Sequence, residues 1–163
     1  MCYASDRRHS ECGRVSSGFN VFKQEAPVIT GSNRRAGMTY TVAYQSAHQS
    51  AELTHHEKVD LQEIHESRQE LARVANANRT RGALINILDS EIVAAPVDII
   101  DNVSGLIEEL KPGCRLAFVA VPEAQEVISM VVTTVAHGHG AKVMGFAELD
   151  EARRWIREGV QPG

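Results

Sequence analysis

The stretch "CRLAFVAVPEAQEVISMVVTTVAHGHGAKVMGF", Cys114 to Phe146, decides the fold of this chain. Its first eight residues, 114–121, are almost all apolar, which is typical of a central strand covered on both faces. After Pro122 the apolar residues recur at helical spacing, and this spacing outweighs the local strand preference of "VVTTV". We expect the inward positions of that helix to be Val127, Ile128, Val131 and Val135. Residues 141–146 then form a second strand, so the stretch predicts two parallel strands joined by a helix.

The sequence His137-Gly138-His139-Gly140 lies between the predicted helix and the second strand. Gly138 or Gly140 can adopt the left-handed conformation that ends many helices. The two histidines then lie near the negative end of the helix dipole, where a partly protonated imidazole is favourable. Two histidines two residues apart cannot by themselves complete the shell of a metal ion. We therefore interpret this motif as a helix end and not as a metal or phosphate site.

The residues before this stretch continue the alternation of strands and helices. Residues 39–45 and 51–59 alternate apolar and polar side chains on either side of a polar turn, which predicts a hairpin. Asp60 and Glu63 have the spacing of a capping box, which begins a helix over residues 61–76. Its expected inward positions are Leu61, Ile64, Leu71 and Ala75, and Arg68 interrupts them. We expect the stem of that arginine to pack while its charge reaches water, a buried acid or a ligand anion.

Three further elements complete the predicted order. Residues 82–88 are a buried strand that ends at Asp89 and Ser90, and a helix follows Pro96. That helix ends at Lys111-Pro112-Gly113, and its inward positions are Ile99, Val103, Leu106 and Leu110. A short amphipathic helix over 149–156 closes the chain, with Leu149, Ala152 and Ile156 inward.

The order ββαβαβαβα predicts a single α/β domain over residues 38–158. The opening hairpin must add an antiparallel strand, whereas crossovers through helices make the later strands parallel. We therefore expect a mixed sheet of four or five strands with about four helices.

The first 37 residues differ in character from this domain. They show no sustained periodicity, and they carry six basic and three acidic side chains against eleven and eighteen in residues 38–163. We interpret residues 1–37 as a disordered N-terminal extension, and Met38 as a possible internal start. Residues 159–163 are interpreted as a tail.

Composition restricts the classes of function. The formal net charge is −4 and the predicted domain has no cluster of lysine and arginine, which argues against nucleic acid or an anionic membrane as partner. No window resembles a membrane-spanning helix or a signal peptide, so we expect a cytoplasmic protein. Cys2, Cys12 and Cys114 form no CxxC motif, which predicts neither a disulfide framework nor a Cys-rich zinc site. No cofactor-binding motif is present, and we expect none to be bound.

Three motifs together resemble a known family. They are the apolar strand that ends in Leu88-Asp89, the strand "RLAFVAV", and the closing "VMGFAELDEARRWI". In the closing motif a strand ends in Phe146, and a helix follows that carries acidic residues, alanine, Trp155 and an aliphatic residue. Over residues 39–157 the chain resembles the STAS-type domains, in particular the SpoIIAA-like (STAS/SEC14) group.

This resemblance implies helices packed mainly on one face of a mixed sheet, and regulatory binding rather than catalysis. In members that act as anti-sigma-factor antagonists, a partner kinase phosphorylates a serine at the start of the helix after the "LD" strand. This sequence departs from that pattern, because Ala95, Pro96 and Val97 stand there. Ser90 is the nearby hydroxyl, which puts a phosphoswitch in doubt.

The segment from Asp89 to Asp101 is the strongest candidate site, since open α/β sheets bind ligands at the carboxyl ends of their strands. The candidate partner-binding or ligand-binding residues are Asp89, Ser90, Glu91, Asp98 and Asp101. Such an acidic rim suits an uncharged or cationic group better than a phosphate. The alternative is structural: Ser90 and Asp98 satisfy loop or helix-start amides and the other acids are solvated.

The histidines of the hairpin and the first helix suggest a second site. His55 and His56 point to opposite faces of the sheet, and His65 lies about one turn into the helix. Three converging metal ligands are therefore not expected, and neither a metal-binding nor a nucleophile motif is found.

These observations leave three hypotheses about function. The first is a non-catalytic regulatory module that binds a protein or a small apolar ligand. The second is a SEC14-like carrier of a lipid-like ligand, and the third is a metal-dependent enzyme that uses the His55 and His65 region. An oligomer is compatible with each of them.

Overall fold

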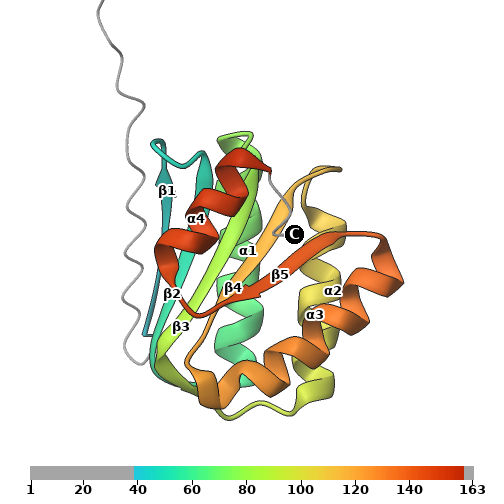
Figure 1. The fold of residues 1–163 in the computed structure, drawn as a ribbon. Helices are drawn as coiled ribbons and strands as arrows, with labels where there is room; N and C mark the ends of the chain where they lie inside the picture. The colour runs from blue at the N-terminus through green and yellow to red at the C-terminus, as the bar shows by residue number, and fades with distance from the viewer. Residues whose placement is uncertain (1–38, 160–163) are drawn as a thin grey trace, which may run out of the picture.

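The computed structural model describes residues 39–159. The predicted extension, residues 1–37, and all but the first residue of the predicted tail lie outside this range. The described chain forms one α/β domain with the predicted order ββαβαβαβα, plus a short 3-10 helix (Figure 1). The elements are β1 (Tyr40–Gln45), β2 (Ser50–Val59), α1 (Leu61–Ala77), β3 (Gly82–Ile92), α2 (Pro96–Glu109), β4 (Arg115–Val119), η1 (Pro122–Ala124), α3 (Gln125–His139), β5 (Lys142–Phe146) and α4 (Leu149–Glu158).

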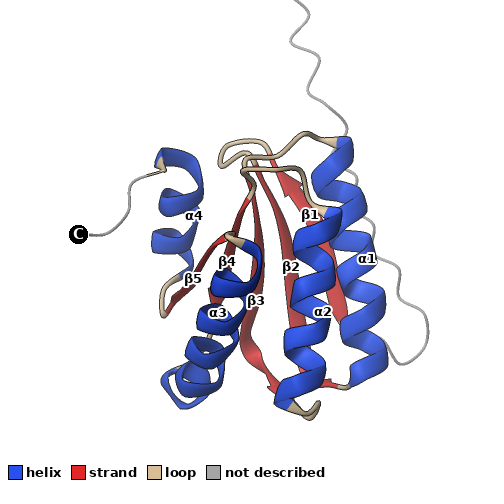
Figure 2. Cartoon of the chain, turned by 90° about the vertical axis from the view of Figure 1, so that its right-hand side faces the viewer, coloured by secondary structure: helices blue, strands red, loops and turns tan. Residues whose placement is uncertain are grey.

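The five strands follow their sequence order across one mixed sheet. β1 pairs with β2 in antiparallel orientation, and all later neighbours are parallel. Helices α1, α2 and α3 cover one face, and α4 lies on the other (Figures 1 and 2). The prediction of a mixed sheet with helices mainly on one face is confirmed.

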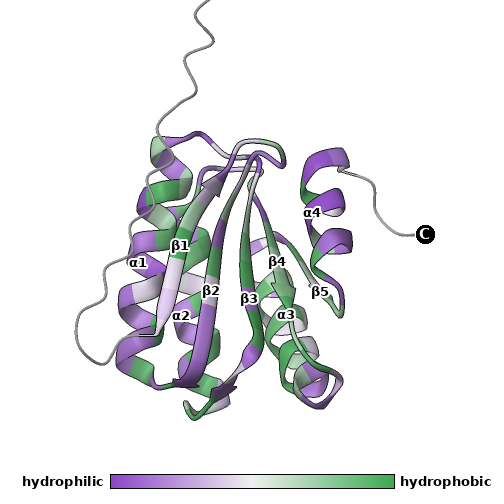
Figure 3. Ribbon diagram, turned by 90° about the vertical axis from the view of Figure 1, so that its left-hand side faces the viewer, coloured by the Kyte–Doolittle hydropathy of each residue, from purple (hydrophilic) through white to green (hydrophobic). Residues whose placement is uncertain are grey.

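Each face of the sheet has its own core. Under α1, α2 and α3 lies the larger cluster, which includes Leu53, Leu71, Leu106 and Val131. A smaller cluster around Leu84, Trp155 and Ile156 lies under α4. The outside of α4 is largely hydrophilic (Figure 3), as expected of a single amphipathic helix that packs with one side.

Two predicted helix positions are wrong. Leu61 is 44% exposed, because Glu63 and not Leu61 occupies the sheet-facing side of the first turn of α1. Val127 is 36% exposed, while its neighbour Ile128 is buried against the sheet. The predicted helix end is confirmed: α3 continues to His139, and left-handed Gly140 donates its N–H to the carbonyl of Ala136.

Strand β3 is longer than predicted. It continues past Leu88 to Ile92, because residues 89–92 pair with the end of β2. The register shifts at His55, where two residues of β3, Ile87 and Leu88, stand opposite one of β2. The Asn86 side chain accepts a hydrogen bond from the Leu88 N–H at 3.0 Å, which satisfies a backbone group at this bulge.

Candidate functional site

The structure separates the five predicted site residues: two line one groove, two line another, and the exposed Asp89 lines neither. Asp89, Ser90 and Glu91 belong to β3, so the predicted loop from Asp89 to Asp101 shrinks to residues 93–95. Ser90 and Glu91 line a groove that faces α3. Asp98 and Asp101 lie on α2 and line a separate, open groove against α1 with His65. The prediction of one continuous acidic loop is therefore wrong, although each residue lies at the carboxyl edge of the sheet or beside it.

We call the first of these hollows the carboxyl-edge groove. It has a volume of about 350 Å³ and lies between the end of β3, the start of α2, and η1 with α3. Its lining is mostly apolar and consists of Ile87, Ser90, Glu91, Ile92, Ala94, Pro96, Ile99, Val121, Glu123, Ala124, Val127 and Ile128. Four large apolar side chains on the segments that form it are exposed: Val93 (54%), Val97 (61%), Val127 (36%) and Met130 (44%).

The rim of this groove is acidic. Glu91 and Glu123 line it, and Asp98 and Glu126 lie in the first turns of the adjoining helices. Among the described residues that line it there is no lysine or arginine. Acidic side chains at two helix starts and an apolar floor favour a partner that is apolar and cationic.

Ser90 and the start of α2 do not form a phosphorylation site of the expected kind. The Ser90 hydroxyl is half-buried and donates to the Ile87 carbonyl at 3.3 Å. The residue before α2 is Ala95, which makes no side-chain hydrogen bond to the helix, and Pro96 follows. The start of α2 therefore offers no side-chain hydroxyl where the resemblance implies a phosphorylated serine.

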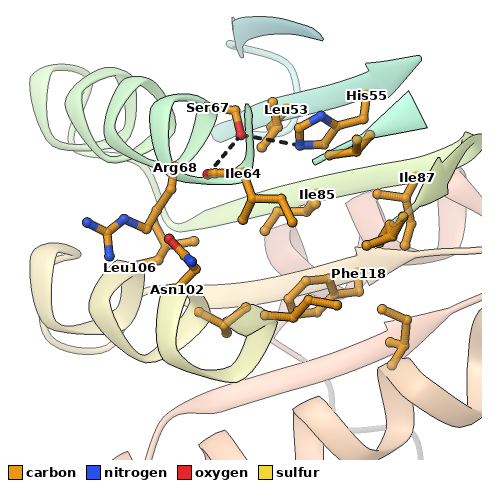
Figure 4. A pocket seen from close by; sticks show the side chains of 15 residues that line it. Leu53, His55, Ile64, Ser67, Arg68, Ile85, Ile87, Asn102, Leu106 and Phe118 are labelled. Carbon is orange, nitrogen blue, oxygen red and sulfur yellow. Dashed lines mark hydrogen bonds between the residues drawn. The ribbon is translucent and has the colours of Figure 1, made fainter. Parts of the chain in front are cut away.

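A second candidate site lies inside the molecule, between β2 and α1. His55 Nδ1 lies 3.1 Å from Glu63 Oε1. His55 Nε2 lies 3.3 Å from Ser67 Oγ, and Figure 4 shows this second contact. All three side chains belong to buried residues, with exposures of 3%, 6% and 1%. Burial lowers the pKa of the His55 imidazole, and the hydrogen bond and charge of Glu63 oppose this effect.

This cluster borders a small, partly open cavity between the sheet and the helices. The cavity has a volume of about 50 Å³, and its walls are almost wholly apolar side chains of β2, β3, β4, α1, α2 and α3. His55, Ser67, Arg68 and Asn102 are its polar neighbours (Figure 4). Arg68 pairs with Glu109 at 3.1 Å, and its Nε is buried without a hydrogen-bond partner. The acid that Arg68 contacts is exposed and not the buried acid that was one of the expected alternatives.

The order Ser67, His55, Glu63 matches the order of a hydrolytic triad, but the surroundings do not support that chemistry. Ser67 lies in the middle of α1, where the backbone N–H groups are hydrogen-bonded within the helix and cannot stabilise an oxyanion. A cavity of about 50 Å³ leaves no room for an acyl substrate. The cluster is better suited to holding a proton than to transferring an acyl group.

The residues of the metal hypothesis do not meet. His55 points into the cluster, while His65 is exposed and contacts Gln69 on the surface of α1. Over residues 39–159 no group of three histidine, cysteine or acidic side chains is placed to hold a metal ion. Burial raises the pKa of the Cys114 thiol, which disfavours its thiolate. Within the same residues, no helix is long and apolar enough to cross a membrane.

Analysis of the sequence missed Ser67 and the partner of Glu63. Asp60 accepts from the Glu63 N–H at 2.9 Å, as a capping box requires, but the Glu63 side chain binds His55. A signal was present: Glu63 and Ser67 are four residues apart on one helix face, and His55 lies on the inward side of the preceding strand.

Known structures identify the fold, although no protein-family model and no curated protein matches the sequence. The structure of the anti-sigma factor antagonist SpoIIAA in its unphosphorylated form matches with a TM-score of 0.52 at 12% identity, over 74% of this chain and 99% of that chain. An uncharacterised protein of the DUF3478 family with a SpoIIAA-like fold, from Shewanella loihica PV-4, matches with a TM-score of 0.50 at 16% identity, over 72% of this chain and 94% of that chain. These likenesses agree with the resemblance in the sequence motifs, and the chain has the STAS-type, SpoIIAA-like fold.

Proposed function

We propose that this chain is a non-catalytic regulatory module that binds a partner protein through the carboxyl-edge groove. The observation that carries the proposal is the mostly apolar groove of about 350 Å³. The exposed Val127 lines it, and the exposed Val93, Val97 and Met130 belong to the segments that form it. Single exposed apolar residues are common on protein surfaces, but an apolar hollow formed by segments that carry several of them is typical of an interaction site. The likeness to an anti-sigma factor antagonist supports the same class of function.

The chemistry of the groove specifies the partner. Glu91 and Glu123 line it with no cation among the described lining residues, so the partner segment must bring lysine or arginine to the rim. The apolar floor requires leucine-like side chains between those cations. We therefore expect a basic amphipathic segment, such as a helix of the partner protein, to occupy the groove.

Site-specific crosslinking followed by binding measurements tests this proposal. A photo-crosslinking residue at Val97 should capture a protein that the same residue at the matched exposed position Glu108, near the other end of α2, does not capture. The captured protein is then purified, and its affinity for the full chain is measured. Val97→Asp should weaken binding by about 30-fold or more if this side chain is an anchor.

Charge-reversed variants test the nature of the partner. Glu91→Lys and Glu123→Lys should weaken the same interaction and reduce its dependence on salt, whereas Glu108→Lys should leave both unchanged. Equal capture at positions 97 and 108, or an affinity that none of the groove variants changes, would contradict the proposal. If a protein is captured at position 97 but Glu91→Lys and Glu123→Lys leave the salt dependence of its binding unchanged, the groove is a binding site and its partner is not basic.

The carrier and enzyme hypotheses receive less support. A cavity of about 50 Å³ is well below the roughly 300–1,000 Å³ of typical small-molecule sites. The surroundings of the His55 cluster argue against acyl transfer, and the separation of His55 and His65 argues against a metal enzyme. The proposed module acts in the cytoplasm without a cofactor or nucleic acid, as the composition suggests, and its oligomeric state is left open.

A further inference from the structure

The first half of α1 contacts the sheet through polar side chains. Glu63 and Ser67 occupy its buried face, whereas fully buried apolar residues begin only at Leu71. Glu63 and Ser67 both contact His55 of β2. The half-buried Ile64 also packs against the larger core. The first two turns of α1 are therefore held on the sheet by this one apolar side chain and by the polar cluster.

The hydrogen bonds of the cluster determine the tautomer of a neutral His55. Glu63 Oε1, 3.1 Å from Nδ1, can only accept when the carboxylate is ionised. Nδ1 must therefore carry the proton. In the other tautomer the lone pair of Nδ1 would face a carboxylate oxygen, and the two would repel each other. Nε2 then accepts from the Ser67 hydroxyl at 3.3 Å.

A second arrangement satisfies the same atoms after one more proton is bound. In the imidazolium both ring nitrogens donate, so Nε2–H donates to Ser67 Oγ. The Ser67 hydroxyl then donates to the Ile64 carbonyl, 3.1 Å away. The hydrogen bonds are thus kept in both arrangements, and what changes is the charge. The imidazolium is a cation removed from water beside almost wholly apolar walls, which disfavours the closed arrangement.

We propose that His55, Glu63 and Ser67 form a buried proton-binding site that holds the first half of α1 on β2 and loosens it when a proton is bound. The proposal is independent of the carboxyl-edge groove. Its ligand is the proton, and the consequence is local opening of residues 61–70 in mildly acidic solution.

The sign of the effect follows from the surroundings of His55. Burial lowers its pKa, Glu63 raises it through a hydrogen bond and charge, and His56 lowers it further, with a net lowering. The unfolded chain therefore takes up the proton first, at about pH 6.5. The stabilisation is complete above that pH, and it is lost as the pH falls toward the lower pKa of the folded state.

Few other charged groups surround the site. On α1 the guanidinium of Arg68 pairs with Glu109 of α2, and from β1 the ring of Tyr40 lies 6.0 Å from the His55 ring. From α2, the uncharged Asn102 borders the same cavity. Glu63 is thus the acid in direct contact with the imidazole.

Nuclear magnetic resonance of the ¹⁵N-labelled histidine rings tests the site directly. In the full chain His55 should show the Nδ1–H tautomer near neutral pH. It should titrate below about pH 6.5, the usual value of a histidine in an unfolded chain. The Nε2–H tautomer, or titration at or above that pH, would overturn the proposal.

Amide hydrogen exchange tests the loosening. Between about pH 7.5 and about pH 5, after correction for intrinsic rates, protection of residues 61–70 should fall by about tenfold relative to residues 71–77. The matched control His65→Gln should keep this response, and His55→Gln should abolish it. Glu63→Gln, which removes the charge and keeps a hydrogen-bonding oxygen, should move the response to lower pH.

The two variants keep the test decisive if one of them unfolds. A response that persists in His55→Gln, or that does not move in Glu63→Gln, would overturn the proposal. So would an unmodified chain in which residues 61–70 and 71–77 respond to acid to the same extent.

Discussion

Gly82, at the start of β3, determines how closely α4 approaches the sheet. A Cβ at this position would lie 2.7 Å from Ile156 Cγ2 and 2.8 Å from the Arg115 carbonyl oxygen. The second contact is with backbone, which cannot rotate away as a side chain can. Ile156 is fully buried on this spot and belongs to the smaller core. The absence of a side chain is therefore required for the packing of α4.

Gly82→Ala is expected to destabilise the domain by about 1–3 kcal/mol, the usual effect of overpacking a core. Chemical unfolding followed by circular dichroism measures the change. The matched control is Gly138→Ala in α3, where a Cβ would meet no atom within 4 Å. Because alanine favours a helix more than glycine does, this variant should gain about 0.5–1 kcal/mol. Two variants of equal stability would contradict this account.

Glu52 and Arg153 form an ion pair that joins β2 to α4. Glu52 is 6% exposed on β2, where it accepts hydrogen bonds from Ser50 at 2.9 Å and from Arg153 of α4 at 2.7 Å. A buried carboxylate needs such partners, because removal from water disfavours its charge. This side chain is thus the polar link between β2 and α4.

Arg153→Met should destabilise the domain by about 2–4 kcal/mol, because it leaves a buried carboxylate without its cation. The double variant Glu52→Gln/Arg153→Met should recover part of this loss, since no buried charge is left unpaired. Thermal or denaturant unfolding of the three proteins provides the comparison. A double variant less stable than Arg153→Met would show that the charge of Glu52 is not what the arginine balances.

At the scale of elements, α1 and α2 begin differently. The Asp60 side chain accepts from the Glu63 N–H at 2.9 Å, whereas Ala95 offers α2 no side-chain cap. Ala95 has extended backbone angles and is exposed, so a capping side chain can be added there without repacking. A capping side chain at position 95 should therefore stabilise the start of α2.

Ala95→Ser should raise the free energy of unfolding by about 0.5–1 kcal/mol, and Asp60→Ala should lower it by about 1 kcal/mol. The first variant supplies a hydroxyl that accepts from the amides of the first turn, and the second removes an acceptor already in use. Urea titrations of both variants measure the two changes. A loss of stability in Ala95→Ser would contradict this account of the start of α2.

The elements could be predicted from the sequence because their burial is periodic. The stripe Ile99, Val103 and Leu106 is buried as predicted, and so is the run from Leu116 to Ala120. The true end of β3 could not be predicted, since it depends on pairing with β2 across a bulge whose polar groups Asn86 satisfies. The period of apolar residues describes a single element, whereas the end of a strand depends on its pairing with a second strand.

The candidate sites follow the same division. Ser90 and Glu91 could be placed at the carboxyl edge from strand order alone. The meeting of His55, Glu63 and Ser67 depends on how α1 is rotated over β2, and their sequence separations of eight and twelve residues contain no record of that rotation. A polar residue on the sheet-facing side of a helix interrupts the apolar stripe, and the sequence does not show which residue it contacts.

At the scale of the whole molecule, the arrangement of layers determines where space is available. Three helices cover one sheet face closely enough to leave a cavity of only about 50 Å³ (Figure 2). The larger hollow, about 350 Å³, lies at the carboxyl edge, where β3 ends and the helices α2 and α3 begin. The larger space at the edge and the small space under the helices favour recognition of a surface over enclosure of a ligand.

The small volume of the cavity under the helices predicts that the protein carries no lipid. Native mass spectrometry of freshly purified full-length chain should give the mass of the polypeptide alone, because an acyl chain needs several times the available volume. A small apolar probe such as xenon should enter the cavity, since apolar cavities of this kind remain dry. Xenon-induced shifts of the methyl resonances of Leu53, Ile85 and Leu106, which line the cavity, would report this binding. A co-purified lipid in stoichiometric amount would show that the helices separate from the sheet in solution, and the carrier hypothesis would then replace the binding module.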